Sequence, residues 1–216
     1  MDPVCERESA NIVLVGAFNP AIFHPSWLRS LDLISPKEAD AAKVEIVHRD
    51  LAAFTVDWFN VQVTADRFSA STTHSAFYAP LRDLVLGIFR ILEHTPVTSM
   101  GLNRTLHYKL ESIHMCNKVG DLLAPKPPWR ELVSEPGLLS LAMMGKRAGS
   151  PGSRYTVKVE PSLVVQPLGT GVYVETNEHF TAASLRDLLE ILGTHWDSAQ
   201  VFGKEVAERL LKQVAS

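Results

Sequence analysis

The sequence predicts an α+β protein in which helices cover a mostly antiparallel sheet. Runs of alternating apolar and polar residues follow one another with short turns between them, at 43–73 and again at 138–176. Each set leads into a segment whose apolar residues recur every three to four positions, the pattern of an amphipathic helix packed on a core. The 216 residues suffice for one sizeable core, so we predict a single compact domain over 1–216.

The first part of the chain is predicted as a strand, two short helices and a meander of strands. The apolar run at 11–18 is typical of a buried strand. Pro25 opens a short helix, and Ser35 before Pro36 is a favourable N-cap for the next. Within the meander, Asn60 predicts the turn between two alternating runs.

The rest of the chain alternates helices with further strands. A helix follows Pro80, an extended run covers 100–110, and a helix lies near 114–123. Three strands are predicted within 138–176, with a hairpin turn at 168–171. Apolar periodicity then predicts helical segments at 185–196 and 201–214.

Two distant stretches of the chain share a pattern. The sequence "LRDL" occurs at 81–84 and at 185–188, each time after a strand-like run. Both helices carry apolar residues at offsets 0, 3, 4, 7 and 11 from that leucine. The pattern predicts an internal duplication with halves 11–110 and 111–216. The alternative is chance, because short amphipathic helices often follow strands.

Bulk properties exclude several classes of protein. A formal net charge of −3 disfavours a uniformly basic nucleic-acid binder. Cys5 and Cys116 are too few for a disulfide framework or a metal cluster. No run approaches the roughly 20 apolar residues that span a bilayer, and acidic residues precede the first apolar run, unlike a signal peptide. We therefore predict a cytoplasmic protein without a membrane partner.

The loop at 144–155 is the first candidate binding site. It combines three glycines with Lys146, Arg147 and Arg154, and its backbone amides could line an anion. A phosphate cradle normally leads into a helix N-terminus, whereas a strand follows here. The alternative interpretation is an ordinary hairpin loop.

The predicted strand at 100–110 is the second candidate. Asn103, Arg104, His107 and Lys109 crowd into it and could line a groove that binds nucleic acid or an anion, with an exposed sheet face as the alternative. His107 is a weak candidate for a catalytic acid or base. No two histidines lie three or four residues apart, so no helical metal chelate is visible; we predict neither a metal nor another cofactor.

Two stretches resemble a family of known sequences. "VTSMGLNRTLHYKL" (97–110) and "LLEILGTHWDSAQVFGKEV" (188–206) are similar to a sporadically distributed, uncharacterised bacterial family. In that family the first stretch is a strand after the first long helix, and the second is the closing leucine-rich helix. The resemblance implies an α+β fold and a bacterial source, and no established activity.

These observations predict a non-enzymatic binding or assembly subunit of a bacterial complex, which associates with itself or with another protein. The prediction rests on the missing catalytic signature and on the apolar content. The alternative is an RNA-binding or RNA-processing protein, similar to duplicated ferredoxin-like proteins that combine a basic glycine-rich loop with a histidine. A small-molecule enzyme of unrecognised class is a third hypothesis.

Overall fold

The computed structural model describes residues 3–150 and 152–215. The strands in this part of the chain are β1 (Val4–Gly16), β2 (Lys43–Val47), β3 (Leu51–Val56), β4 (Phe59–Thr64), β5 (Arg67–Thr72), β6 (Val97–Lys109), β7 (Leu141–Gly145), β8 (Arg154–Pro161) and β9 (Gly171–Thr181). They form one antiparallel sheet in the order β2-β3-β4-β5-β1-β6-β9-β8-β7, which confirms the predicted α+β class.

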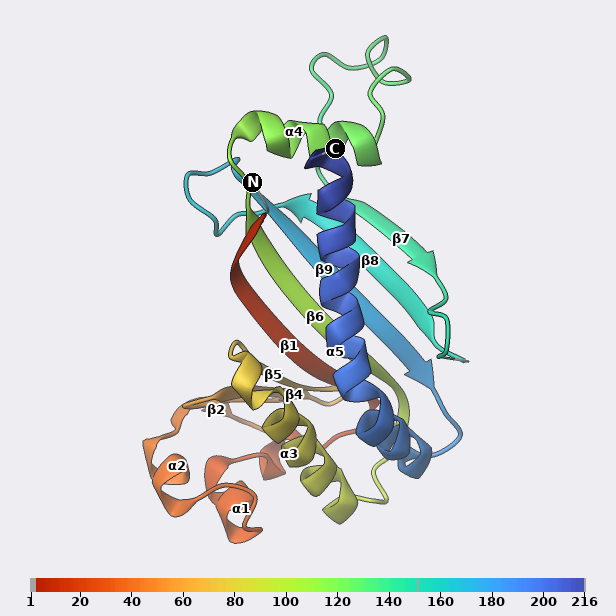
Figure 1. The fold of residues 1–216 in the computed structure, drawn as a ribbon. Coiled ribbons are helices and arrows are strands. Elements are labelled where there is room, and N and C mark those ends of the chain that lie inside the picture. Colours follow the sequence, from red (N-terminus) through yellow and green to blue (C-terminus); the bar gives the residue numbers. More distant parts are fainter. Residues whose placement is uncertain (1–2, 151, 216) are drawn as a thin grey trace.

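The helices pack on one side of this sheet (Figure 1). They are α1 (Pro25–Ser30), α2 (Pro36–Ala41), α3 (Tyr78–Ile91), α4 (Ile113–Leu123) and α5 (Leu185–Ala215), with 3-10 turns at Pro20–Ile22 and Ser75–Phe77. Ser35 caps α2 through a reciprocal pair of hydrogen bonds with Glu38, as its position before Pro36 predicts. No helix among the described residues is long and apolar enough to cross a membrane.

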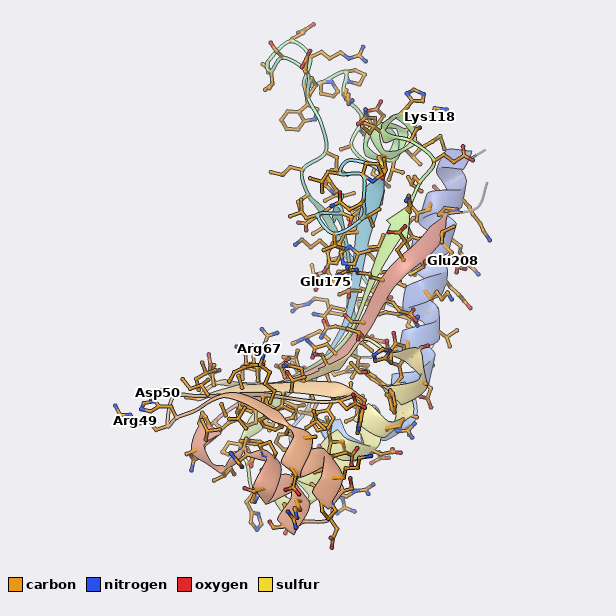
Figure 2. The ribbon with its side chains drawn as sticks, turned by 90° about the vertical axis from the view of Figure 1, so that its left-hand side faces the viewer. Arg49, Asp50, Arg67, Lys118, Glu175 and Glu208 are labelled. Atoms are coloured by element: carbon orange, nitrogen blue, oxygen red, sulfur yellow. The ribbon has the colours of Figure 1, made fainter. Side chains whose placement is uncertain are left out.

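The sheet is sharply bent. Figure 2 shows the arm formed by β2 to β5 at a steep angle to the arm that contains β6 and β9. The helices lie outside the bend, and the opposite face of the sheet lies inside it. The labelled side chains Arg67 and Glu175 point into the bend from different arms, whereas Glu208 lies on the helix side.

Apart from the extra edge strand β2, the order of the strands is symmetrical about the β1–β6 pair. Beyond β1 lie β5, β4 and β3, and beyond β6 lie β9, β8 and β7. Each three-strand meander is followed by a helix, α3 or α5, on the same face. A duplicated unit would produce this arrangement, with β6 as the counterpart of β1, so that the second unit would begin near Val97 rather than at residue 111. The duplication of the sequence stays a prediction.

Two hydrophobic clusters lie between the sheet and its helices. The larger cluster joins β1 and β3 to β5 with α3 and the first half of α5, where it includes Leu188 and Trp196. The smaller cluster joins β6, β8 and β9 with α4 and the last turns of α5, where it includes Ala207 and Leu211. The same helix therefore closes both clusters with two successive stretches of one apolar stripe.

Between the two clusters, α5 crosses the sheet at close range over Gly203. A Cβ atom there would lie 2.6 Å from Thr176 Oγ1 and 3.3 Å from the Cβ of Arg104. Both Thr176 and Arg104 are buried on the covered face of the sheet. The absence of a side chain at Gly203 is thus what lets the helix backbone reach the strands at this point.

One sequence prediction about local structure was wrong. Asn60 lies inside β4, and the turn falls at Asp57 and Trp58, because Val56 and Phe59 pair directly across the hairpin. The segments predicted as helical at 185–196 and 201–214 are both helical, and they are parts of one continuous helix, α5, of 31 residues. Glycine lowers helix propensity by only about 1 kcal/mol, and the apolar stripe on both sides of Gly203 outweighs that cost.

The close crossing at Gly203 can be tested with one substitution made at two positions of α5. Gly203→Ala should lower the free energy of unfolding by roughly 1–3 kcal/mol, because the new methyl group overlaps Thr176. Gly193→Ala meets no atom within 4 Å and should raise it by up to about 1 kcal/mol through helix propensity. Urea denaturation of both variants measures the difference, and a shift of the same sign in both would contradict the crossing.

Candidate binding face

The uncovered face of the sheet is a broad surface lined mainly by polar side chains. The covered face carries the apolar residues of each strand, so the alternate residues point into the bend. Most of these are Ser, Thr, Asn, Gln or charged residues, and most are half-buried by their neighbours. We call this surface the concave face.

One row of register partners crosses the concave face from edge to edge. In sheet order the row consists of Lys43, Thr55, Asn60, Ser71, Asn11, Asn103, Asn177, Thr156 and Met144. Directly opposed residues of neighbouring strands share a face, so these side chains lie side by side. Seven of the nine are uncharged polar groups, and three asparagines occupy the central strands. We call it the polar row.

Hydrogen bonds link some members of the polar row to their neighbours. Asn60 Nδ2 donates to Thr55 Oγ1 at 2.9 Å, and Asn103 Nδ2 donates to the carbonyl of Asn11 at 3.4 Å. Ser69, next to the row, donates to Asn11 Oδ1 at 3.1 Å. The Oδ1 atom of Asn177 is buried and has no hydrogen-bond partner among the described residues. The hydrogen-bonding groups at the centre of the row are thus only partly satisfied by one another.

Two lysines of the concave face are paired with carboxylates, whereas Arg7, Arg67 and Arg154, on three different strands of the same face, form no ion pair among the described residues. Lys158 Nζ lies 2.8 Å from Glu160 Oε1 on the same strand, and Lys109 Nζ lies 3.5 Å from Glu6 Oε1. Tyr173 donates to Glu175 at 2.7 Å. These pairs alternate in sign along the β6–β9–β8 arm, so this part of the face offers local dipoles and no extended field of one sign.

His107 lies on the concave face near one end of β6. Its Nδ1 is 2.9 Å from Ser162 Oγ, and its ring packs 4.8 Å from the ring of Tyr173. Burial, and secondarily the charge of Arg7, lower the pKa of His107 below its ordinary value. Ser162 is itself buried, and its oxygen also accepts from the amides of the loop that follows, so it presents no nucleophile to solvent. This geometry favours a structural role for His107.

Arg104 lies on the opposite face from the other three candidates of its strand. Strand alternation points Asn103, His107 and Lys109 into the bend and Arg104 under α5. There Arg104 donates to Glu8 at 2.5 Å and to the backbone carbonyl of Gln200 at 2.6 Å. Its guanidinium also lies 5.3 Å from the ring centre of Tyr78, and burial raises the pKa of Tyr78 to about 12. Arg104 thus stabilises the covered face.

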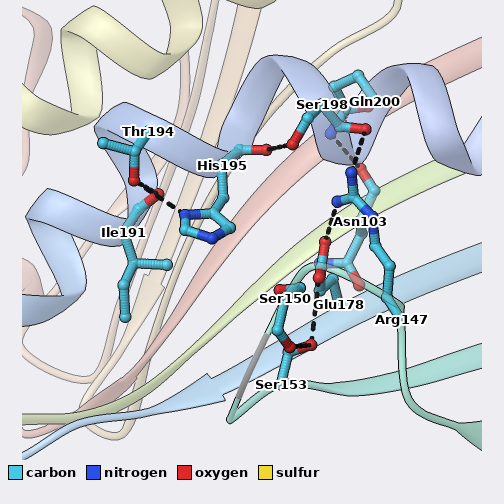
Figure 3. Close-up of polar contacts among 10 residues, drawn as sticks. All are labelled: Asn103, Arg147, Ser150, Ser153, Glu178, Ile191, Thr194, His195, Ser198 and Gln200. Atoms are coloured by element: carbon cyan, nitrogen blue, oxygen red, sulfur yellow. Dashed lines mark hydrogen bonds and ion pairs between the residues drawn. The ribbon is translucent and has the colours of Figure 1, made fainter.

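Arg147 is also occupied by contacts within the protein. Figure 3 shows it between the β7–β8 loop and α5, where it donates to Glu178 at 2.8 Å and to the carbonyl of Ser198 at 3.1 Å. Glu178 is completely buried, and its other oxygen accepts from Ser153 at 3.2 Å. The guanidinium also lies over the ring of Phe202 at 4.8 Å. The loop is therefore fastened to the helix by its own arginine.

The remaining basic candidates do not gather around His107. Lys146 is exposed in the β7–β8 loop, and Arg154 opens β8 opposite His179. His179 is opposite Gly101 on β6, which is six residues from His107. At about 3.3 Å per residue, His107 and Arg154 are on the order of 20 Å apart. The predicted residues thus occupy three separate places and form no single site.

Comparison of the chain with protein-family models and with curated proteins finds no match. Among the described residues, no group of three or more His, Cys, Asp or Glu side chains could hold a metal ion. Function is therefore inferred from the geometry of the concave face. Sequence reasoning missed its polar row, because the register partners come from distant segments. The available signal was the recurrence of Asn, Ser and Thr at outward positions of successive strands.

The contacts of Arg147 predict that its substitution destabilises the protein far more than substitution of the neighbouring Lys146. Arg147→Ala removes the charge partner of the completely buried Glu178 and should lower the free energy of unfolding by about 3 kcal/mol. Lys146→Ala, one residue earlier and exposed, should change it by less than about 0.5 kcal/mol. Chemical denaturation of both variants measures the contrast. Equal, small effects would mean that the ion pair does not hold the loop.

The two histidines of the concave face predict a dependence of stability on pH. The folded protein lowers the pKa of His107 and of His179, in each case mainly by burial and secondarily by an arginine, Arg7 or Arg154. The unfolded chain therefore binds more protons, so this contribution to stability is present above about pH 6.5 and is lost as the pH falls through the lowered folded pKa values.

Titration by NMR checks both histidines separately. Arg7→Gln should raise the pKa of His107 and leave that of His179 unchanged, and Arg154→Gln should do the reverse. Either substitution should move its histidine only part of the way to the ordinary value, because burial remains. A histidine that titrates at or above about 6.5 in the unmodified protein would contradict the described environment.

Proposed function

We propose that the protein is a non-enzymatic binding or assembly protein of a bacterial complex, and that it holds a macromolecular partner on its concave face. The observation that carries the proposal is the polar row, which lines the inside of a bent sheet whose other side is taken up by helices. Half-buried amides and hydroxyls on a fixed backbone are suited to recognition by hydrogen bonds.

The size of the concave face favours a large partner. Neighbouring strands lie about 4.8 Å apart, so the row across the sheet is on the order of 38 Å long. A small molecule fills a concave pocket lined mainly by apolar groups, which is a different kind of surface. A long polar surface inside a bend suits a folded domain or an extended segment of another protein.

Charge favours a protein over a nucleic acid as the partner. Affinity for nucleic acid comes mainly from Lys and Arg contacts with phosphates. Lys158 and Lys109 are paired with Glu160 and Glu6 on this face. The unpaired Arg7, Arg67 and Arg154 lie on three different strands and form no single basic stripe. Arg104 and Arg147 are committed to contacts under α5. The net charge of the chain is −3. If the protein binds RNA instead, the following experiment would detect the bound nucleic acid.

A pair of double variants tests the concave face. Gln62→Arg with Thr156→Arg places two bulky charges on it, one on each arm. Gln213→Arg with Thr194→Arg makes the same replacements at exposed positions of α5, outside the bend. Because the overall charge changes equally, a difference between the two variants reports the location of the substitutions.

The readout is affinity purification from cells that naturally make the protein, followed by light scattering and the 260/280 nm absorbance ratio across the peak. We expect a defined protein partner with the unmodified chain and with the α5 variant, and at least a tenfold lower yield with the concave-face variant. Equal recovery by both variants would overturn the proposal. Bound nucleic acid that salt removes would overturn it in favour of RNA binding.

A further inference from the structure

The two edges of the sheet differ in how they are protected against pairing. At one edge, β2 carries Lys43 and Glu45 and contains an irregularity in register between Val44 and Ile46. Charges and bulges are the usual means by which an edge strand avoids a second strand. At the other edge, β7 pairs with β8 in regular register from Leu141 to Gly145 and carries no charge.

Large apolar side chains are exposed along the β7 edge. Met143 is 62% exposed and Met144 is 70% exposed, and Leu139, just before the strand, is 83% exposed. The chain has no charged residue from Pro136 to Gly145. A soluble domain that presents an unguarded, apolar edge strand either aggregates or has a partner strand for it.

We propose that β7 pairs antiparallel with β7 of a second copy of this chain, so that two sheets become one across a two-fold axis. This inference rests on the edge strand and the segment before it, and does not require a partner on the concave face. Such an interface is isologous, because each copy contributes the same segment. The short uncharged strand meets its own copy without opposing like charges.

The ends of β7 are complementary in the way that a two-fold axis requires. Antiparallel pairing brings the start of one strand to the end of the other. Before β7 lie Glu135 and a hollow lined by Trp129, Val133 and Leu139, with a volume of about 410 Å³. At the end of β7 lie Met144 and Lys146. A flexible methionine can fill the hollow of the other copy.

The area of contact also involves the segment before β7. A stable interface buries on the order of 800 Å² per partner, which five residues of strand do not supply alone. The preceding segment adds exposed apolar side chains, among them Trp129 at 53%, Leu132 at 77% and Val133 at 53%. Aromatic and aliphatic groups of this kind provide most of the binding energy of such interfaces.

One substitution at each edge tests the proposal. Met143→Lys places a charge in the interface twice, because the two-fold axis repeats it, and its side chain is on the covered side of the sheet, away from the concave face. Ile46→Lys makes the same kind of change at the β2 edge, where Ile46 is 43% exposed. Light scattering over a dilution series measures the dissociation constant of each chain.

We expect the unmodified chain and Ile46→Lys to form a dimer of twice 23.9 kDa, and Met143→Lys to dissociate at least tenfold more readily. A monomer at 100 µM, a dimer indifferent to Met143→Lys, or equal weakening by both variants would each overturn the proposal. A monomeric chain that binds another protein through β7 is among those overturning results. If no partner is found for the concave face but the chain still forms a dimer through β7, the proposed function fails and this inference holds.

A cross-linking scan keeps the test independent of the stability of the lysine variant. Single cysteines at Leu141, Ala142 and Met143 are oxidised in a chain that also carries Cys5→Ser and Cys116→Ser. Residues at a two-fold axis between antiparallel strands approach within disulfide range, so one position should give a cross-linked dimer far faster than the others. Absence of a cross-linked dimer at all three positions would contradict the pairing of β7 with itself.

Discussion

The crossing of α5 over the middle of the sheet is the constraint on which the other features depend. Gly203 brings the helix backbone against Thr176, and two arginines reach from opposite sides to carbonyl groups of the same helical turn. Arg104 comes from the central strand β6, and Arg147 comes from the hairpin at the sheet edge. Each also pairs with a carboxylate of the sheet, so neither charge is buried alone.

The contacts of Arg104 and Arg147 with Glu8, Glu178 and the carbonyl groups of α5 form a polar belt. This polar belt separates the two hydrophobic clusters of the interior. Trp196 and Ala199 belong to the first, Ala207 and Leu211 to the second, and the contacts of Gln200 and Gly203 lie between them. A buried ion pair contributes little net stability compared with apolar packing, but removing one partner is costly. The belt therefore fixes the position of α5 along the sheet more than it adds to the free energy of folding.

Sequence alone could predict the features that depend on neighbouring residues, but not those that depend on contacts between distant strands. The stripes that begin at Leu81 and Leu185 and the alternation in the strands depend on neighbours along the chain, so they predicted the class of fold and most elements. Asn60 misled because asparagine favours turns, although here its amide bonds to Thr55 across a hairpin. The partners Asn11 and Asn103 are 92 positions apart, and only the register of β1 with β6 brings them together.

The buried arginines show why charge in a sequence was a poor guide to the candidate binding face. Arg104 and Arg147 follow glycines and polar residues, as a phosphate-binding residue would, but their partners Glu8 and Glu178 are distant in sequence. Both arginines donate to backbone carbonyl groups of α5 and so hold the helix against the sheet. The concave face is left with neutral amides and hydroxyls and with scattered charges, so it recognises shape and hydrogen-bonding pattern more than charge. Helices pack on the covered face and support the sheet. A polar surface of this kind is better suited to binding a protein through hydrogen bonds than to attracting an anion by its charge.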